Sequence, residues 1–177
     1  MSDLLRVYLD PAVICPDGYP DVWRIGLDGN PAIKDLVRAQ AGHRCERCGH
    51  PYRSGEHGNG EWSPCDGHCT HDGPVREGTY RDQGGIWRPE AQWRILTVHH
   101  LNGVKHDCRW WNLAALCQRC HLRIQGRVVM DRVYPWEHSE WFKPHAAGWY
   151  AWTYLGEDLT RQQTMDRLEE LLALEAA

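Results

Sequence analysis

The sequence has little phenylalanine, no long apolar run and no secretory leader pattern. The sequence contains one Phe and ten Trp, so a core must use large amphipathic rings whose N–H groups need hydrogen-bond partners. No apolar run approaches the roughly 18 residues of a membrane helix. The first residues lack both a basic region and a continuous apolar stretch. We therefore expect a soluble, cytoplasmic protein with no membrane partner.

Cysteine and histidine are abundant instead, with eight and eleven residues in a chain of 177. Without a secretory leader, this content indicates metal ligands rather than a disulfide framework. The other composition values, 42% hydrophobic and 25% charged residues, are ordinary for a globular chain and argue against disorder or coiled coil. The length fits one domain with decorations or two small domains.

Charge is distributed unevenly along the chain. Residues 99–155 hold seven basic against four acidic side chains, a net charge of +3, whereas residues 1–30 carry −3 and residues 156–177 carry −4. The overall value of −4 therefore conceals a basic stretch. Such a stretch keeps an anionic partner in consideration, although the total charge argues against one.

Helix and strand signals lie on both sides of a long polar segment. Asn30-Pro31 offers an N-cap with a first-turn proline, and Gly42 offers a stop, which together predict a helix over 31–41. A capping box followed by an apolar stripe predicts an amphipathic helix over 160–175. Between them the pattern predicts a Gly-rich insertion at 51–92, strands at 93–98 and 113–116, and a helix from Gln118 to Gly126.

Two CxxC pairs offer the clearest metal chemistry, Cys45 with Cys48 and Cys117 with Cys120. They supply four thiolates, the set that Zn²⁺ takes in closed tetrahedral structural sites. A redox pair of the thioredoxin kind needs a βαβ context, which the pattern lacks. We therefore predict one structural zinc that closes residues 49–116 into a large loop.

A second constellation begins with His99-His100 at the end of the predicted strand. Asn112-Leu113 opens the next strand, and Cys120-His121 lies on the helix that follows. The stretch TVHHLNGVKHDCRWWNLAALCQRCH resembles the ββα-metal (His-Me finger) core of HNH endonucleases. The match covers residues 93–125 together with the first CxxC pair, a minority of the chain.

The resemblance implies a role for each of these residues. It assigns His100 as the general base that activates water, and Asn112 as the residue that holds the loop of the base. It assigns His99 and His121 as ligands of a catalytic divalent ion, Mg²⁺ or Mn²⁺. Imidazole suits the base because its unperturbed pKa is about 6.5. A divalent ion with open positions suits the leaving 3′ oxygen, because it stabilises the charge that develops there.

Each residue also has a structural interpretation. Adjacent strand residues point to opposite faces, so His99 could face away from His100 unless the strand end twists. His121 could replace a cysteine at the zinc, although four cysteines already fill a tetrahedral site. Asn112 could be an ordinary turn residue, which would still hold the loop.

The Gly-rich insertion carries a further set of metal-binding side chains, Cys65, Cys69 and His71. They could hold a second zinc, because this segment has little else to fold around. Free thiols and scattered histidines are the alternative interpretation. Cys15 and Cys108 have no partner in the pattern and are interpreted as buried small residues.

Basic residues accompany the HNH-like stretch. Arg119, Arg123 and Arg127 recur at helical spacing on the helix of His121, and Lys105 and Arg109 precede them in the loop. We expect these side chains to contact DNA phosphates. A solvated helix face is the alternative.

Together these inferences predict an α+β fold with three segments. They are a lead-in and helix at 1–44, a zinc-stapled ββα-metal nuclease domain at 45–128, and an aromatic-rich extension with a terminal helix at 129–177. We expect a metal-dependent endonuclease that cleaves DNA in a bacterial or phage-infected cell. Two alternatives stay open: a non-catalytic, zinc-dependent nucleic-acid-binding module, and a protein-binding adaptor.

Overall fold

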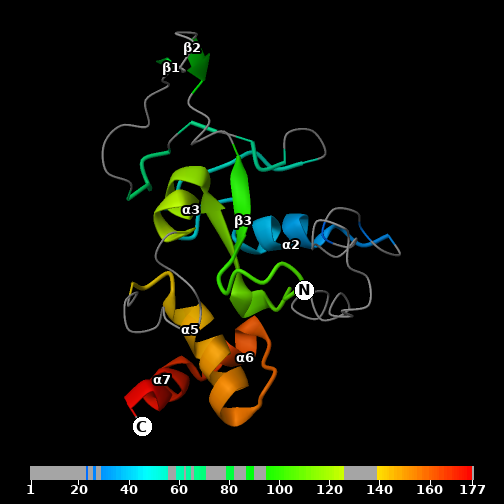
Figure 1. Cartoon of the computed structure of the whole chain (residues 1–177), viewed down its shortest axis with the longest axis vertical. Coiled ribbons are helices and arrows are strands. Elements are labelled where there is room, and N and C mark those ends of the chain that lie inside the picture. Colours follow the sequence, from blue (N-terminus) through cyan, green and yellow to red (C-terminus); the bar gives the residue numbers. More distant parts are fainter. Residues whose placement is uncertain are drawn as a thin grey trace. The chain divides into compact units, whose positions relative to one another are not determined.

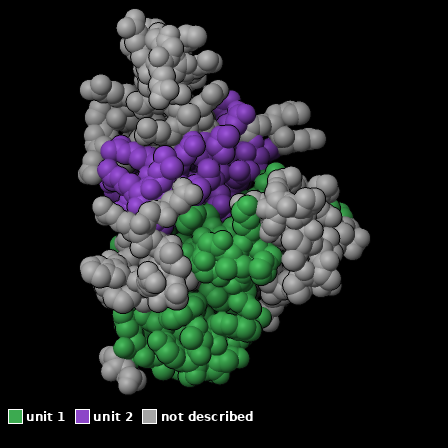
Figure 2. All heavy atoms as spheres, viewed as in Figure 1, with its two compact units in different colours: residues 1–37, 99–114, 127–177 green, residues 38–98, 115–126 purple. Residues whose placement is uncertain are grey.

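The described residues form short helices and two small sheets in a computed structural model (Figure 1). The described residues are 23, 26, 29–55, 59–61, 63, 64, 66–70, 79–81, 87–89, 95–125 and 139–176. Contacts divide the chain into two units (Figure 2). Unit 1 comprises residues 1–37, 99–114 and 127–177, and unit 2 comprises residues 38–98 and 115–126. No helix among the described residues is both long and apolar enough to cross a membrane.

The principal sheet pairs β3 (Leu96–His100) with β4 (Leu113–Cys117). The pairing is antiparallel, because the Leu101 N–H donates to the Asn112 carbonyl while Thr97 bonds the Leu116 carbonyl. All five residues of β4 are buried, which explains its continuous apolar sequence. The expected strand at 113–116 is therefore confirmed, and the preceding strand ends two residues later than 93–98 predicted.

A second sheet lies inside the Gly-rich insertion. Strand β1 (Thr79–Arg81) pairs antiparallel with β2 (Trp87–Pro89), so that Tyr80 lies opposite Arg88. The sequence predicted only a loop here, because three-residue strands are too short to show an alternating pattern. The insertion thus contains regular structure, and the observed class is α+β.

Helix α2 (Ile33–Gln40) confirms the expected helix over 31–41 with tighter bounds. It buries one face, formed by Ile33, Leu36 and Val37. The first turn begins at the Ala32 carbonyl, which accepts from Asp35 and Leu36, rather than at the predicted Asn30 cap.

The stop signal of this helix is confirmed at Gly42. Gly42 adopts φ +61°, a left-handed conformation that costs least without a Cβ. The His43 N–H then donates to the Arg38 carbonyl and the Gly42 N–H to the Ala39 carbonyl. This pair of bonds is the Schellman motif, which reverses the chain directly before Cys45.

Unit 1 contains a close helix contact between the turn η3 (Trp110–Asn112) and helix α5 (Lys143–Tyr150). A Cβ on Gly148 would lie 2.7 Å from the Cβ of Trp111 and 2.8 Å from the Trp110 ring, so only glycine fits. Nδ1 of the buried His145 hydrogen-bonds the Trp111 carbonyl at 2.9 Å. These contacts fix the turn that ends at Asn112.

The C-terminal part consists of short helices: the π-helical turn η4 (Ala151–Leu155), α6 (Arg161–Asp166), α7 (Leu168–Leu172) and the 3₁₀ turn η5 (Ala173–Ala176). The Thr160–Gln163 capping box is confirmed, with both reciprocal bonds present. The prediction of a single helix over 160–175 is wrong, because the helix is interrupted at Arg167, between α6 and α7. The guanidinium of Arg167 pairs there with Glu157 and Glu170.

Candidate metal centre

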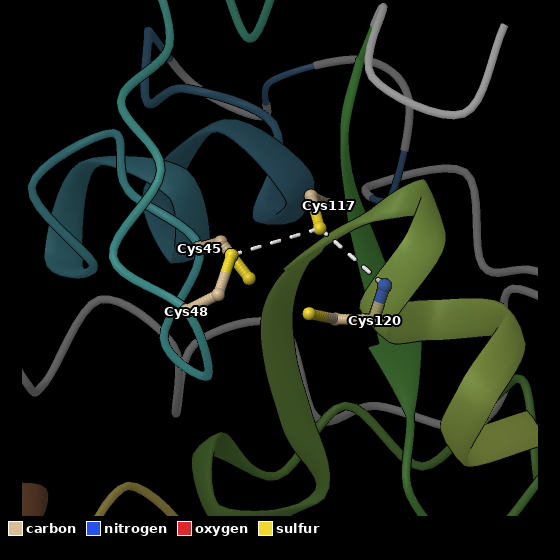
Figure 3. A group of neighbouring side chains, drawn as sticks. All are labelled: Cys45, Cys48, Cys117 and Cys120. Carbon is tan, nitrogen blue, oxygen red and sulfur yellow. Dashed lines mark hydrogen bonds between the residues drawn. The ribbon is translucent and has the colours of Figure 1, made fainter. Parts of the chain in front are cut away.

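Four buried cysteines converge in unit 2: Cys45, Cys48, Cys117 and Cys120. Their sulfur atoms all lie within 4.8 Å of one another, and those of Cys48 and Cys117 are 3.9 Å apart. Zinc–thiolate bonds of about 2.3 Å in a tetrahedron place neighbouring sulfurs about 3.8 Å apart. Figure 3 shows the four side chains pointing toward one another. The geometry and donor set therefore fit Zn²⁺.

The first pair of cysteines lies on a tight knuckle that follows α2. The Cys45 N–H donates to the His50 carbonyl, and the Gly49 N–H donates back to the Cys45 carbonyl. Gly49 adopts φ +72°, and a Cβ there would lie 3.0 Å from the His68 carbonyl oxygen. Glycine after Cys48 is therefore required both by conformation and by space.

Glu46 attaches this knuckle to β4. Its backbone N–H donates to the Ala115 carbonyl at 2.9 Å, and its Oε2 accepts from the Ala115 N–H at 2.7 Å. One residue thus satisfies both backbone groups of Ala115, two residues before Cys117. These two hydrogen bonds of Glu46 set the register between the two CxxC pairs. Cys48 and Cys117 are 69 residues apart in the sequence.

The second pair spans the junction of β4 and α3 (Gln118–Gln125). The Cys120 N–H points back to the sulfur of Cys117 at 3.4 Å. Cys120 and Ile124, one turn apart, face the interior of unit 2, whereas Leu122 and Arg123 are exposed. The helix therefore orients its buried face by the metal ligand and one apolar residue.

The thiols of the cysteine cluster influence one another. Hydrogen bonding with Cys120, Cys45 and Cys48 raises the pKa of Cys117. The same contact with Cys117 lowers the pKa of Cys120. Four thiolates cannot share a buried site without a compensating cation. A divalent zinc would supply this compensation.

The predicted second zinc site lies only partly within the described residues. Cys65 and His71 lie outside the described residues, so the predicted second zinc stays a prediction. Cys69 lies with its sulfur 3.8 Å from Nδ1 of the fully buried His50, a neighbour that the predicted ligand set did not include. The Thr70 N–H donates to the Cys48 carbonyl, so this segment packs on the knuckle.

His100 ends β3 as a buried side chain in unit 1. It is 5% exposed, and its ring centroid lies 4.7 Å from that of Trp23. Burial first, and then charge repulsion from His99 and His106, lower the pKa of His100 to about 4. The imidazole is therefore neutral at pH 7, in the form that accepts a proton. His99 is partly buried.

Asn112 organises the loop between β3 and β4. Its Oδ1 accepts from the Asn102 N–H at 2.8 Å, and its Nδ2 donates to Asn102 Oδ1 at 2.8 Å and to the Asp107 carbonyl at 2.7 Å. Asn102 in turn donates from Nδ2 to the Asp107 carboxylate. Asn112 is fully buried. Asn112 therefore makes three hydrogen bonds inside the loop, and its predicted role beside the base stays a prediction.

His121 lies in unit 2, directly after Cys120 of the four-cysteine cluster. Its Nδ1 is 3.2 Å from Oγ1 of Thr97, and that hydroxyl also donates to the Leu116 carbonyl at 2.7 Å. Burial lowers the pKa of His121, so the ring is neutral at pH 7. A divalent ion needs a neutral imidazole. His121 therefore fits a ligand role in its protonation state.

The basic residues occupy different environments. Lys105 and Arg123 are exposed, and Arg119 is partly buried. Arg109 bonds Asp107 at 3.1 Å, and its guanidinium lies 4.0 Å from the centroid of Trp152. Arg127 lies outside the described residues. Phosphate contact by these side chains stays a prediction.

The sequence reasoning missed Glu46 and Thr97. Glu46 stands inside a CxxC pair, a position that could have marked it, but nothing in the pattern indicates its partner Ala115. Thr97 occupies an ordinary β-branched strand position. No protein family, curated protein or solved structure matches this chain. The site is therefore interpreted from its own chemistry.

Proposed function

We propose that this chain is a metal-dependent endonuclease of the HNH type that hydrolyses phosphodiester bonds of DNA. The main support is the buried, neutral His100 at the end of β3, together with the loop that Asn112 braces directly after it. A neutral imidazole is the form that can act as a general base, and a fixed loop limits the orientations of the base.

In this proposal His100 takes a proton from water as the water oxygen bonds to phosphorus. The bond from phosphorus to the 3′ oxygen breaks and that oxygen takes a proton from a second water, which leaves 5′-phosphate and 3′-hydroxyl ends. His99 and His121 are the ligands of Mg²⁺ or Mn²⁺, which when bound stabilises the charge on the leaving oxygen. His100 afterwards returns its proton to solvent.

The zinc has a separate task in this proposal. It joins Cys45 and Cys48 to Cys117 and Cys120, and so fixes the junction of β4 and α3 just before His121. A closed ZnS₄ site has no open position for substrate, so its role is structural. Catalytic chemistry falls to the histidines.

Cleavage of supercoiled plasmid by zinc-loaded protein tests the proposal. We expect nicking or linearisation with Mg²⁺ or Mn²⁺ and none after EDTA, with zinc content measured after chelation to show that the structural ion is retained. His100→Ala should cleave at least about 10²-fold more slowly, the usual size of a general-base contribution.

The matched control is His106→Ala, which removes an exposed imidazole from the same loop and should keep most activity. Metal-independent plasmid binding without cleavage by the wild type would favour the nucleic-acid-binding module instead. If the wild type neither binds nor cleaves the plasmid, the protein-binding adaptor is favoured instead.

A further inference from the structure

The hydroxyl of Thr97 lies between two groups of unit 2. Oγ1 is 2.7 Å from the Leu116 carbonyl oxygen and 3.2 Å from Nδ1 of His121. Thr97 belongs to β3, Leu116 to β4, and His121 to α3. One side chain therefore connects all three elements around the second CxxC pair.

Counting protons fixes the direction of both bonds. A carbonyl oxygen can only accept, and two oxygens 2.7 Å apart repel unless a proton lies between them. The one hydrogen of the Thr97 hydroxyl is therefore donated to Leu116. The hydroxyl oxygen can then only accept from His121, so Nδ1 of the ring carries the proton. A neutral imidazole with its proton on Nδ1 has its lone pair on Nε2.

We propose that Thr97 is a positioning residue that holds His121 in the Nδ1–H tautomer and thereby makes Nε2 the nitrogen that binds the divalent ion. This inference rests on the proposed function. Histidine ligands commonly depend on a partner at their other ring nitrogen, which fixes the tautomer and the ring orientation. Here that partner is a hydroxyl whose own orientation is fixed by the carbonyl of Leu116, directly before the zinc ligand Cys117.

The tautomer can be observed without any activity measurement. Protein labelled with ¹⁵N-histidine, zinc-loaded and free of Mg²⁺ and Mn²⁺, is examined at pH 7.5 by long-range ¹H–¹⁵N correlation spectra. Protonated and bare ring nitrogens give well-separated shifts, and His121→Gln identifies the His121 signals. In the wild type we expect His121 to have a protonated Nδ1 and an unprotonated Nε2.

Two variants test the role of the hydroxyl. Thr97→Val keeps the β-branched shape but removes the acceptor, so the His121 signals should move toward the Nε2–H tautomer, and affinity for Mn²⁺ should fall by about 10-fold to 100-fold. Thr97→Ser keeps the hydroxyl and should restore both readouts. Mn²⁺ affinity is measured by titration, and retained zinc shows that each variant is folded.

Each outcome bears on a different claim. An Nε2–H tautomer in the wild type, or a Thr97→Val protein with unchanged tautomer and Mn²⁺ affinity, would overturn the role of Thr97. Recovery in Thr97→Ser of both readouts would support it against a general packing effect. Absence of Mn²⁺ binding in a wild type that shows the Nδ1–H tautomer would refute the proposed function and the ligand role of Nε2, while the spectra would still establish the bond to Thr97.

Discussion

Replacing Asn112 by aspartate should destabilise the chain strongly, although the two side chains have nearly the same shape. The amide nitrogen of Asn112 donates to Asn102 Oδ1 and to the Asp107 carbonyl, 2.8 and 2.7 Å away. Asn112→Asp replaces that nitrogen by an oxygen, so the Asp107 carbonyl loses this donor, Asn102 Oδ1 keeps only the Val104 N–H, and both oxygens face a third acceptor. The side chain is fully buried, so water cannot replace the missing donor.

The magnitude follows from the number of bonds lost. Each buried acceptor left without a donor costs about 1–3 kcal/mol. The Asp107 carbonyl without this donor and the weakened contact at Asn102 together give a loss of about 3 kcal/mol, a large part of the 5–15 kcal/mol typical of a native domain. A protonated carboxyl would recover one donor, so the deficit should shrink as the pH falls from 8 toward 5.

Urea unfolding of zinc-loaded protein, followed by tryptophan fluorescence, measures this loss. Trp110 and Trp111, next to Asn112, are two of the ten tryptophans that contribute to this signal. The control is Gln162→Glu, the same amide-to-carboxylate change at an exposed residue whose amide donates to the side-chain oxygen of Asp166. It should cost about 0.5 kcal/mol or less. A loss below about 1 kcal/mol for Asn112→Asp would refute the role of the network.

Three further results are expected. Cys117→Ser should lose zinc and unfold at a much lower temperature, since metal binding contributes to folding energy. Metal analysis of the wild type should give about one zinc per chain from this site, or about two if the insertion holds a second. A wild type that keeps its melting temperature after the metal is removed would exclude the site. The His100 pKa near 4 in the folded chain lies below its value in the unfolded chain, so the unfolded chain binds more protons between pH 6.5 and 4. As the pH falls over that range, the free energy of unfolding should decrease by about 3 kcal/mol more in the wild type than in His100→Gln. Equal decreases in urea melts would contradict this. Arg123→Ala should weaken binding to all DNA sequences alike and lower the salt slope by about one; loss for a single sequence would indicate base contact instead.

Local signals predicted the elements around the metal centre well. The helix end at Gly42, the buried strand Leu113–Cys117 and the helix that starts at Gln118 each follow from a few adjacent residues. The four-cysteine cluster followed from the spacing, because two CxxC pairs supply the ligand set that a tetrahedral zinc takes. These features depend on short-range chemistry that one sequence displays.

The errors have a common cause in longer-range contacts. The helix predicted over 160–175 breaks at Arg167, whose guanidinium pairs with Glu157 outside the helix, and the apolar stripe continues through the break without a signal. Glu46 finds its partner Ala115 on a strand 69 residues away. Thr97 is likewise an ordinary strand residue until β4 and α3 are in place. Such partners are chosen by the tertiary structure, and a single sequence does not contain their pairing.

Plasmid cleavage by His100→Ala and His121→Ala across a Mn²⁺ titration tests the central claim most directly. We predict that both variants fold and retain zinc. High Mn²⁺ should partly restore His121→Ala, because excess ion offsets a weakened ligand set, and should do little for His100→Ala, which lacks the proton acceptor. Full activity in His100→Ala at any metal concentration would contradict the account. Rescue of His100→Ala by Mn²⁺ alone would mean that His100 is a metal ligand and not the base.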